Sequence, residues 1–255
     1  MSEKIVSACL LIIGNEILSG RTRDANLPWL AERLNALGIR LMEARIIPDL
    51  EPVIVRTVNE VRTAFDYVFT TGGIGPTHDD ITAECVAKAF GVRLIQHPDA
   101  VARLRAYYRN PADLNPMRLR MANVPEGATL IDNPVSRAPG FQIGNVFVMA
   151  GVPQIMQAMF DGIAPRLKGG APVLSRTVRA ELAEGQLAEG LAALQARYAG
   201  IDIGSYPSFR PGGRPSVAIV LRGTDGAQLA AAVEELKALM QSLGATPVEE
   251  EGVSG

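Results

Sequence analysis

The polypeptide has 255 residues, enough for one large domain or two modest ones, and its 47% hydrophobic and 20% charged residues exclude a mainly disordered chain. Its 25 Lys and Arg against 27 Asp and Glu give a net charge of −2, so there is no bulk positive field to hold nucleic acid or an anionic membrane. Any anion site must therefore be local. Cys9 and Cys85 lack the spacing of a redox pair or a zinc site, and the apolar run 8–13 is far shorter than the ~18 residues that span a bilayer. We therefore expect a cytoplasmic protein.

The first half of the chain alternates short apolar runs with amphipathic segments, which is typical of βαβ units on a parallel sheet. The predicted strands are 6–13, 41–47 and 67–71, and the predicted helices between them are 26–37 and 53–64. Leucines recur at helical spacing in the first of these helices, and Gly38 ends it.

The third predicted strand runs into a glycine-rich segment, 72–76, and then into a helix that ends at Phe90. Residues 98–121 predict two helices with a basic side, separated at Asn110-Pro111. A turn-rich loop at 133–140, a hairpin of 141–143 with 146–149, and a helix from Pro153 to near Leu167 follow.

A Gly/Pro stretch, 168–172, separates two patterned regions and predicts a boundary between domains 1–170 and 171–255. The second domain is predicted to be a small α+β layer that ends in an acidic tail, Glu249-Glu250-Glu251. Its predicted strands are 173–179, 201–206 and 216–221, and its predicted helices are 186–198 and 227–243.

The sharpest chemical signal is TTGGIGPTHDDIT, residues 70–82, which joins a strand end, a glycine-rich turn and two carboxylates at a helix start. Glycines let backbone N–H groups approach a phosphate closely, and a helix N-terminus adds roughly half a positive charge. Parallel sheets also bind ligands at the carboxyl ends of their strands. The candidate phosphate-binding residues are Gly72, Gly73, Gly75, Pro76 and Thr77.

Spacing alone leaves a structural alternative open, in which the glycines turn a corner while Thr77 and Asp80 form a capping-box-like pair. The adjacent Asp79 and Asp80 favour function, because two carboxylates in a phosphate cradle would repel the ligand unless a divalent cation lay between them. Carboxylates select hard ions such as Mg²⁺ or Mn²⁺. His78 is weaker evidence, since a lone loop histidine is more often solvent-exposed than a ligand.

Loops after the first two strands should reach the same edge of the sheet as this segment. They carry Glu16, Asp24 and Asn26 after the first strand and Asp49 after the second. Together with Asp79 and Asp80, these carboxylates would form an acidic crevice suited to a metal. The alternative is that Asp24 caps its helix, Asp49 makes a turn and the others are solvated.

These segments resemble the molybdopterin-binding domain family. The segment 70–82, with GNEILSGRTRDAN upstream and NPVSRAPGF and VMAGVPQIMQAM downstream, is most similar to the competence/damage-inducible protein A branch over residues 5–167. The resemblance implies a mostly parallel three-layer α/β/α sandwich and a homo-oligomer. ELAEGQLAEGLAALQARYAGIDIGSYPSF is similar to the accessory domain of that branch and of eukaryotic FAD synthases. We expect no room for the deamidase domain of full-length members.

The resemblance also implies roles for individual residues. In the molybdenum-cofactor enzymes the glycine loop binds the pterin phosphate, and aspartates matching Asp49 and Asp80 are implicated in catalysis of adenylyl transfer. The DDxT form, with Asp79 and Asp80 as metal positions, accompanies metal-dependent hydrolysis of ADP-ribose-like pyrophosphates. The matching ligand-side loop carries Asp24 and Asn26.

Two positions depart from the family pattern. Ser136 replaces the usual glycine of the NPxG loop, and Ala150 replaces the proline that usually precedes Gly151. Arg137, beside the first departure, could add a bidentate phosphate contact or could block the pocket.

Three functions are consistent with the sequence. The first is a pyrophosphatase that acts on ADP-ribose- or FAD-like nucleotides with Mg²⁺, Mn²⁺ or Co²⁺ as its cofactor. The second is pterin binding or adenylyl transfer in molybdenum-cofactor synthesis, and the third is a non-catalytic nucleotide-binding module. Each predicts a nucleotide or pterin phosphate ligand, and none predicts a nucleic-acid or membrane partner.

Overall fold

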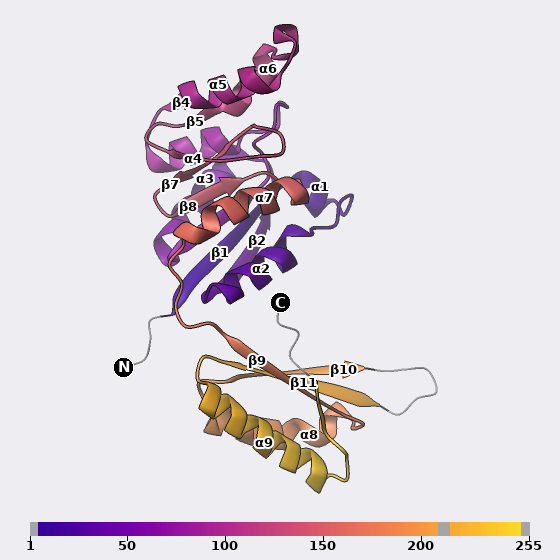
Figure 1. The fold of residues 1–255 in the computed structure, drawn as a ribbon. Helices are drawn as coiled ribbons and strands as arrows, with labels where there is room; N and C mark the ends of the chain where they lie inside the picture. Colours follow the sequence, from indigo (N-terminus) through magenta and orange to yellow (C-terminus); the bar gives the residue numbers. More distant parts are fainter. Residues whose placement is uncertain (1–4, 209–214, 251–255) are drawn as a thin grey trace. The chain divides into compact units, whose positions relative to one another are not determined.

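A computed structural model of the chain describes residues 5–208 and 215–250 (Figure 1). The chain divides into two compact units, Met1–Gly170 and Ala171–Gly255. Within the described residues, no helix is both long enough and apolar enough to cross a membrane.

A six-stranded sheet with the order β2-β1-β3-β8-β7-β6 forms the centre of the first unit. The parallel strands are β2 (Ile39–Ile47), β1 (Val6–Ile13), β3 (Tyr67–Thr71) and β8 (Val146–Met149). Next to β8, β7 (Gly140–Ile143) runs antiparallel, and the edge strand β6 (Thr129–Ile131) pairs antiparallel with β7. The expectation of a mostly parallel sheet is confirmed.

Two layers of helices cover this sheet because successive side chains on a buried strand point to opposite faces. On β1, Cys9, Leu11 and Ile13 pack with α3 (Glu51–Ala64) and α4 (Thr82–Phe90). Ala8, Leu10 and Ile12 pack on the other side with α2 (Asn26–Ala36) and α7 (Pro153–Ile163). The predicted three-layer α/β/α sandwich is therefore correct (Figure 1).

Between α4 and β6 the chain leaves the main sheet and builds a small substructure with its own core of Ala100, Leu104 and Ala122. It contains α5 (Pro98–Tyr107), α6 (Pro116–Leu119) and a two-stranded antiparallel pair, β4 (Leu94–Gln96) with β5 (Asn123–Pro125). The two basic helices were predicted, but β4, β5 and β6 were not. The short helical elements of the first unit are α1 (Asn15–Leu18) and 3-10 turns at Pro111–Asp113, Arg120–Ala122 and Ala164–Arg166.

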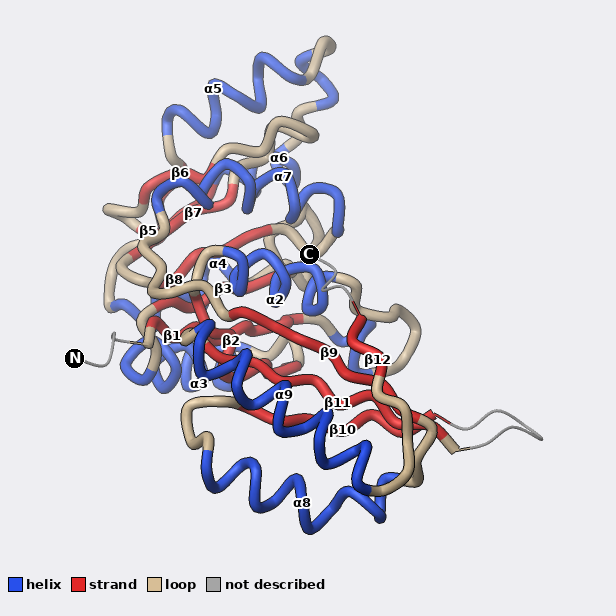
Figure 2. The backbone as a smooth tube through the Cα atoms, turned by 60° about the horizontal axis from the view of Figure 1, so that its bottom comes forward, coloured by secondary structure: helices blue, strands red, loops and turns tan. Residues whose placement is uncertain are grey.

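The second unit is a four-stranded antiparallel sheet with the order β10-β11-β9-β12, and its two helices lie on one face (Figure 2). Its elements are β9 (Leu174–Ala180), α8 (Glu184–Arg197), β10 (Asp202–Ser208), β11 (Ser216–Gly223), α9 (Gly226–Ser242) and β12 (Val248–Glu250). The predicted small α+β domain is confirmed.

The acidic end of the chain is a strand within the described residues, which corrects its prediction as a tail. In β12, Glu249 pairs with Arg176 and with Lys237, and Glu250 pairs with Arg179. These cations come from β9 and α9. The acidic segment, which the sequence predicted to be a tail, therefore forms ion pairs with basic side chains of the folded unit. Glu251 lies outside the described residues.

Candidate functional site

The turn after β3 needs glycine at two positions. Gly72 and Gly73 have φ values of 101° and 68°. A Cβ atom would lie 2.1 Å from the Ile13 carbonyl oxygen at Gly72, and 2.1 Å from the Thr82 hydroxyl oxygen at Gly73. The Thr82 hydroxyl donates to the Gly72 carbonyl at 3.1 Å, and the Thr82 N–H donates to the Gly73 carbonyl at 3.0 Å. The turn is therefore clamped against the start of α4, which begins at Thr82, two residues after the carboxylates.

Asp79 and Asp80 converge on one hydroxyl group. The Thr77 hydroxyl oxygen lies 2.6 Å from Asp79 Oδ1 and 2.5 Å from Asp80 Oδ2, and the Thr77 N–H donates to Asp80 Oδ2 at 2.8 Å. The hydrogen bond from Thr77 holds the pKa of Asp79 below its ordinary value. The predicted contact between Thr77 and Asp80 does form, but its hydrogen bonds close the turn that precedes α4 and do not cap the helix itself. His78 is solvent-exposed, as expected.

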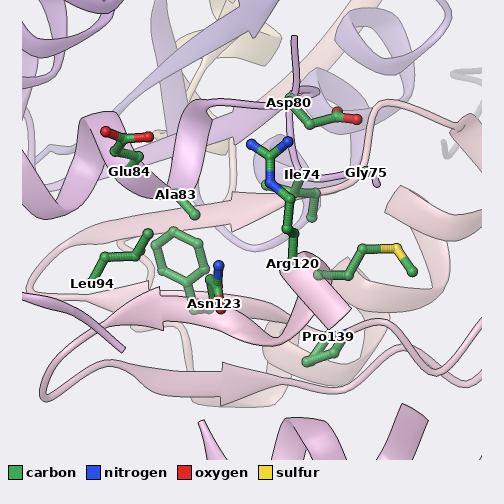
Figure 3. Close-up of a pocket in the computed structure, with 12 residues that line it drawn as sticks. Ile74, Gly75, Asp80, Ala83, Glu84, Leu94, Arg120, Asn123 and Pro139 are labelled. Atoms are coloured by element: carbon green, nitrogen blue, oxygen red, sulfur yellow. The ribbon is translucent and has the colours of Figure 1, made fainter. Parts of the chain in front are cut away.

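A cavity of about 90 Å³ opens beside this turn (Figure 3). It is lined by the glycine turn, by Asp80 and Glu84, and by Arg120 and Asn123 of the substructure between α4 and β6. Arg120 crosses the cavity, and its Nη1 donates to the Thr77 carbonyl at 3.1 Å. A guanidinium, a carboxylate and a glycine turn thus share one cavity at the carboxyl end of β3.

A second cavity of about 60 Å³ lies between the ends of β1 and β3 and the start of α7, and its lining includes Glu16, Asp24, Asn26 and Gly151. Asp24 accepts the Leu27 N–H at 2.7 Å and so pairs a donor in the first turn of α2, whose N-cap position is Ala25. Asn26 is 4% exposed, and its Nδ2 donates to the Gly151 carbonyl at 2.8 Å. Its Oδ1 has no hydrogen-bond partner among residues 5–208 and 215–250. Buried polar atoms rarely stay unpaired, so this oxygen is an acceptor available to a ligand.

The expected acidic crevice does not form. Asp49 accepts the Asn15 N–H at 2.9 Å and lines neither cavity, while Asp24 and Asp80 line different ones. In residues 5–208 and 215–250, no three His, Cys, Asp or Glu side chains come together to hold a metal ion. These aspartates follow strands that end at the same edge of the sheet, but their carboxylates accept hydrogen bonds from different backbone N–H groups.

Arg137 also lies apart from the glycine turn. It lines an open groove with Arg103, Ala106, Tyr107 and Arg109 rather than the 90 Å³ cavity. It therefore neither contacts nor blocks that cavity. The cation at the cavity is Arg120, which sequence reasoning recognised only as part of a basic helix side.

Comparison with known proteins identifies the family. Residues 9–169 match a family model described as "Probable molybdopterin binding domain". The chain belongs to the molybdopterin-binding domain family. Residues 172–249 match a second model, "FAD synthase, middle domain", so both units of this family member have a recognisable counterpart.

Several relatives of this molybdopterin-binding domain protein are longer than the aligned region. A protein of Pyrobaculum aerophilum is 39% identical over 65% of this chain and 64% of its own length. A "CinA-like protein" of Salinibacter ruber is 38% identical over 73% of this chain. The aligned region is 48% of that relative, so this chain spans only about half of its length.

One solved structure supports the fold at useful sequence identity. The crystal structure of "the protein CinA with unknown function" from Thermoplasma acidophilum is 32% identical, with a TM-score of 0.59, over 64% of this chain and 99% of that chain. The predicted resemblance to the competence/damage-inducible protein A branch is confirmed.

Proposed function

We propose that this chain hydrolyses the diphosphate bond of ADP-ribose- or FAD-like nucleotides with the help of a divalent metal ion. The observation that carries the proposal is the cavity in which the glycine turn, Arg120 and Asp80 meet. In the reaction, a water oxygen would bond to one phosphorus while the bridging P–O bond breaks, which yields AMP with ribose 5-phosphate or with FMN.

The cavity suits a phosphoryl group rather than a whole nucleotide. Its volume of about 90 Å³ is well below the roughly 300–1,000 Å³ of pockets that enclose a small-molecule ligand, so the nucleoside would lie outside it. Glycines permit close approach of the backbone to phosphate oxygens, and the Arg120 guanidinium supplies donors for them. Arg120 is therefore the proposed phosphate-orienting cation.

Asp79 and Asp80 are the residues that would hold a metal ion. The Thr77 hydroxyl has one proton, so it can donate to only one of the two carboxylate oxygens within 2.6 Å of it. The second short oxygen–oxygen contact has no hydrogen from the hydroxyl and would be relieved by a cation. Two carboxylates plus substrate phosphate oxygens are a usual environment for Mg²⁺. A bound divalent ion would neutralise phosphate charge and polarise the phosphoryl group.

Asn26 and Asp24 are proposed to bind the remainder of the ligand. The unpaired Oδ1 of Asn26 fits a hydroxyl or N–H donor, which ribose and adenine both carry. The proposed catalytic role of Asp49 is less direct, because its carboxylate fixes the turn after β1 through the Asn15 N–H.

A pterin ligand is the second candidate, and the description of the matched family model favours it. The "FAD synthase, middle domain" match of the second unit supports a nucleotide instead. The glycine turn and Arg120 would serve either ligand, since they recognise phosphate rather than the group attached to it.

Product release from ADP-ribose and from FAD, with Mg²⁺, Mn²⁺ or Co²⁺, tests the proposal. We expect AMP from the wild type and a loss of at least 100-fold in Asp80→Asn, a size typical of one transition-state contact. Asp202→Asn, an exposed aspartate in the second unit, is the matched control and should keep full activity. No AMP with any of the metals would refute the hydrolase proposal, and titration with a phosphorylated pterin would then test the second candidate. Asp49→Asn measured in the same assay tests the proposed role of that residue.

A further inference from the structure

A groove of about 490 Å³ lies apart from both cavities and is lined by Arg103, Ala106, Tyr107, Arg109 and Arg137. These residues define the arginine groove. Its lining residues come from two segments, the carboxyl-terminal half of α5 with the residues just beyond it, and the loop 132–139 that joins β6 to β7. Three guanidinium groups thus come together from parts of the chain about thirty residues apart.

Most of this positive charge is uncompensated. Arg103 donates to Asp132 at 3.0 Å, which neutralises one of the three cations. Within the described part of the chain, neither Arg109 nor Arg137 has a carboxylate within salt-bridge distance, and both side chains are exposed. The groove therefore carries two unpaired guanidinium groups beside a tyrosine ring.

The backbone of Arg137 is held in a conformation that arginine rarely adopts. Its φ of 62° is the single positive value among the non-glycine residues that the structure describes. Buried Asn133 fixes the loop around it, because Oδ1 accepts the N–H groups of Val135 and Ser136 while Nδ2 donates to Ser136 Oγ and the Ala138 carbonyl. Glycine would adopt this φ at no steric cost, whereas arginine adopts it at a cost in conformational free energy. An arginine at this position despite that cost points to a role for its side chain.

We propose that the arginine groove is a phosphate-binding site distinct from the one at the glycine turn. Guanidinium groups bind phosphate oxygens with paired N–H donors, and here two are free to do so. The same loop reaches the first site, since Pro139 lines the 90 Å³ cavity two residues after Arg137. The bound group is a free phosphate ion or a distal phosphate of the nucleotide at the cavity. The groove proposal does not depend on turnover at that cavity.

Calorimetric titration of the full chain with inorganic phosphate tests the proposal. We expect binding by the wild type that weakens at least tenfold in Arg109→Ala and in Arg137→Ala. Arg105→Ala is the matched control, because Arg105 is an exposed arginine in the last turn of α5 that does not line the groove. Because the cavity is itself a proposed phosphate site, the groove variants are also titrated in an Arg120→Ala background, and the phosphate binding that remains in Arg120→Ala alone is assigned to the groove.

Arg137→Gly separates a binding role from a structural one. This variant should melt at the same or a higher temperature than the wild type, because glycine tolerates the positive φ, and yet it should lose phosphate binding. Phosphate binding that Arg109→Ala and Arg137→Gly both leave undiminished in the Arg120→Ala background would overturn the proposal. A loss in Arg105→Ala as large as in the groove variants would also overturn it, since general charge would then explain the binding.

The source of the phosphate follows from a second titration with ADP-ribose and with ADP-ribose 2′-phosphate. Tighter binding of the doubly phosphorylated nucleotide that disappears in Arg109→Ala would support the distal-phosphate form of the proposal. Equal binding of both nucleotides, together with groove-dependent binding of inorganic phosphate, would support a free-ion site. Failure of AMP release would refute only the hydrolase function and would leave these titrations unaffected.

Discussion

At the scale of single residues, Gly72 shows how the site geometry constrains the sequence. Its positive φ is disfavoured for any other residue, and a Cβ atom would meet the Ile13 carbonyl, a backbone atom that cannot move aside. Gly127 also has a positive φ, 83°, but nothing lies within 4 Å of a Cβ there. A substitution by alanine would therefore strain the backbone at both positions, but it would create a steric clash only at Gly72.

We predict that Gly72→Ala lowers the free energy of unfolding by about 3 kcal/mol or more, and Gly127→Ala by about 1 kcal/mol. Urea denaturation of both variants measures the difference. Equal losses would show that the β3 turn can relax, and that the contact with Ile13 does not require glycine.

Glu249 gives a prediction on pH at the same scale. The hydrogen bond from Lys237 lowers the pKa of Glu249, and the nearby Arg176 acts in the same direction. A carboxyl group with a lowered pKa in the folded state stabilises the protein above its unfolded pKa of about 4.3, and this stabilisation is lost as the pH falls through the folded value.

Glu249→Gln should therefore destabilise the second unit by about 1 kcal/mol at pH 7 and by less at pH 3, because part of the stabilisation is lost below the unfolded pKa. Glu234→Gln is the control, because Glu234 also pairs with Lys237 but its side chain is 69% exposed. A Glu249→Gln effect that stays the same at both pH values would contradict the assignment.

At the scale of elements, the loop between β6 and β7 depends on one amide. Asn133 is 2% exposed and makes four hydrogen bonds within five residues of itself. Removing it leaves backbone groups of the loop without partners, which costs roughly 1–3 kcal/mol. The loop would then no longer hold Arg137 at its positive φ.

We predict that Asn133→Ala lowers the unfolding free energy by about 2 kcal/mol and also weakens phosphate binding at the arginine groove. Asn110→Ala is a matched change, since Asn110 is exposed and accepts one backbone N–H, from Ala112. It should cost under about 1 kcal/mol. Thermal melts and the phosphate titration together measure both effects.

At the scale of the whole molecule, the two units have separate cores. Leu34 of α2 and Leu236 of α9 are both fully buried, each against the sheet of its own unit. Truncation of a buried leucine to alanine costs about 2–5 kcal/mol. Because each buried cluster of the described residues belongs to a single unit, the cost should stay within that unit.

Leu236→Ala should therefore increase hydrogen exchange in α9 and β9 to β12 while exchange in β1 and β3 stays at the wild-type rate. Leu34→Ala should have the reverse pattern. Exchange that rises throughout the chain in either variant would show that the units unfold together.

The sequence by itself determined the elements whose pattern is long enough to read. Short apolar runs between amphipathic segments identified β1, β2 and β3. Helical spacing identified α2, α3, α8 and α9, because that period repeats several times within each of these helices. Three-residue strands such as β4, β5 and β12 contain too few residues to show a period. The glycine turn was also evident, since its composition is itself the signal.

Only the tertiary structure decided which side chains meet. Asp24, Asp49 and Asp80 follow strands that end at one edge, but each carboxylate bonds a different N–H group, so the expected cluster does not form. Arg120 reaches Thr77 from 43 residues away, and two of the cations that pair with β12, Arg176 and Arg179, lie about seventy residues earlier in the chain. Local periodicity carries no information on such pairings, because they are set by how the layers pack rather than by neighbours along the chain.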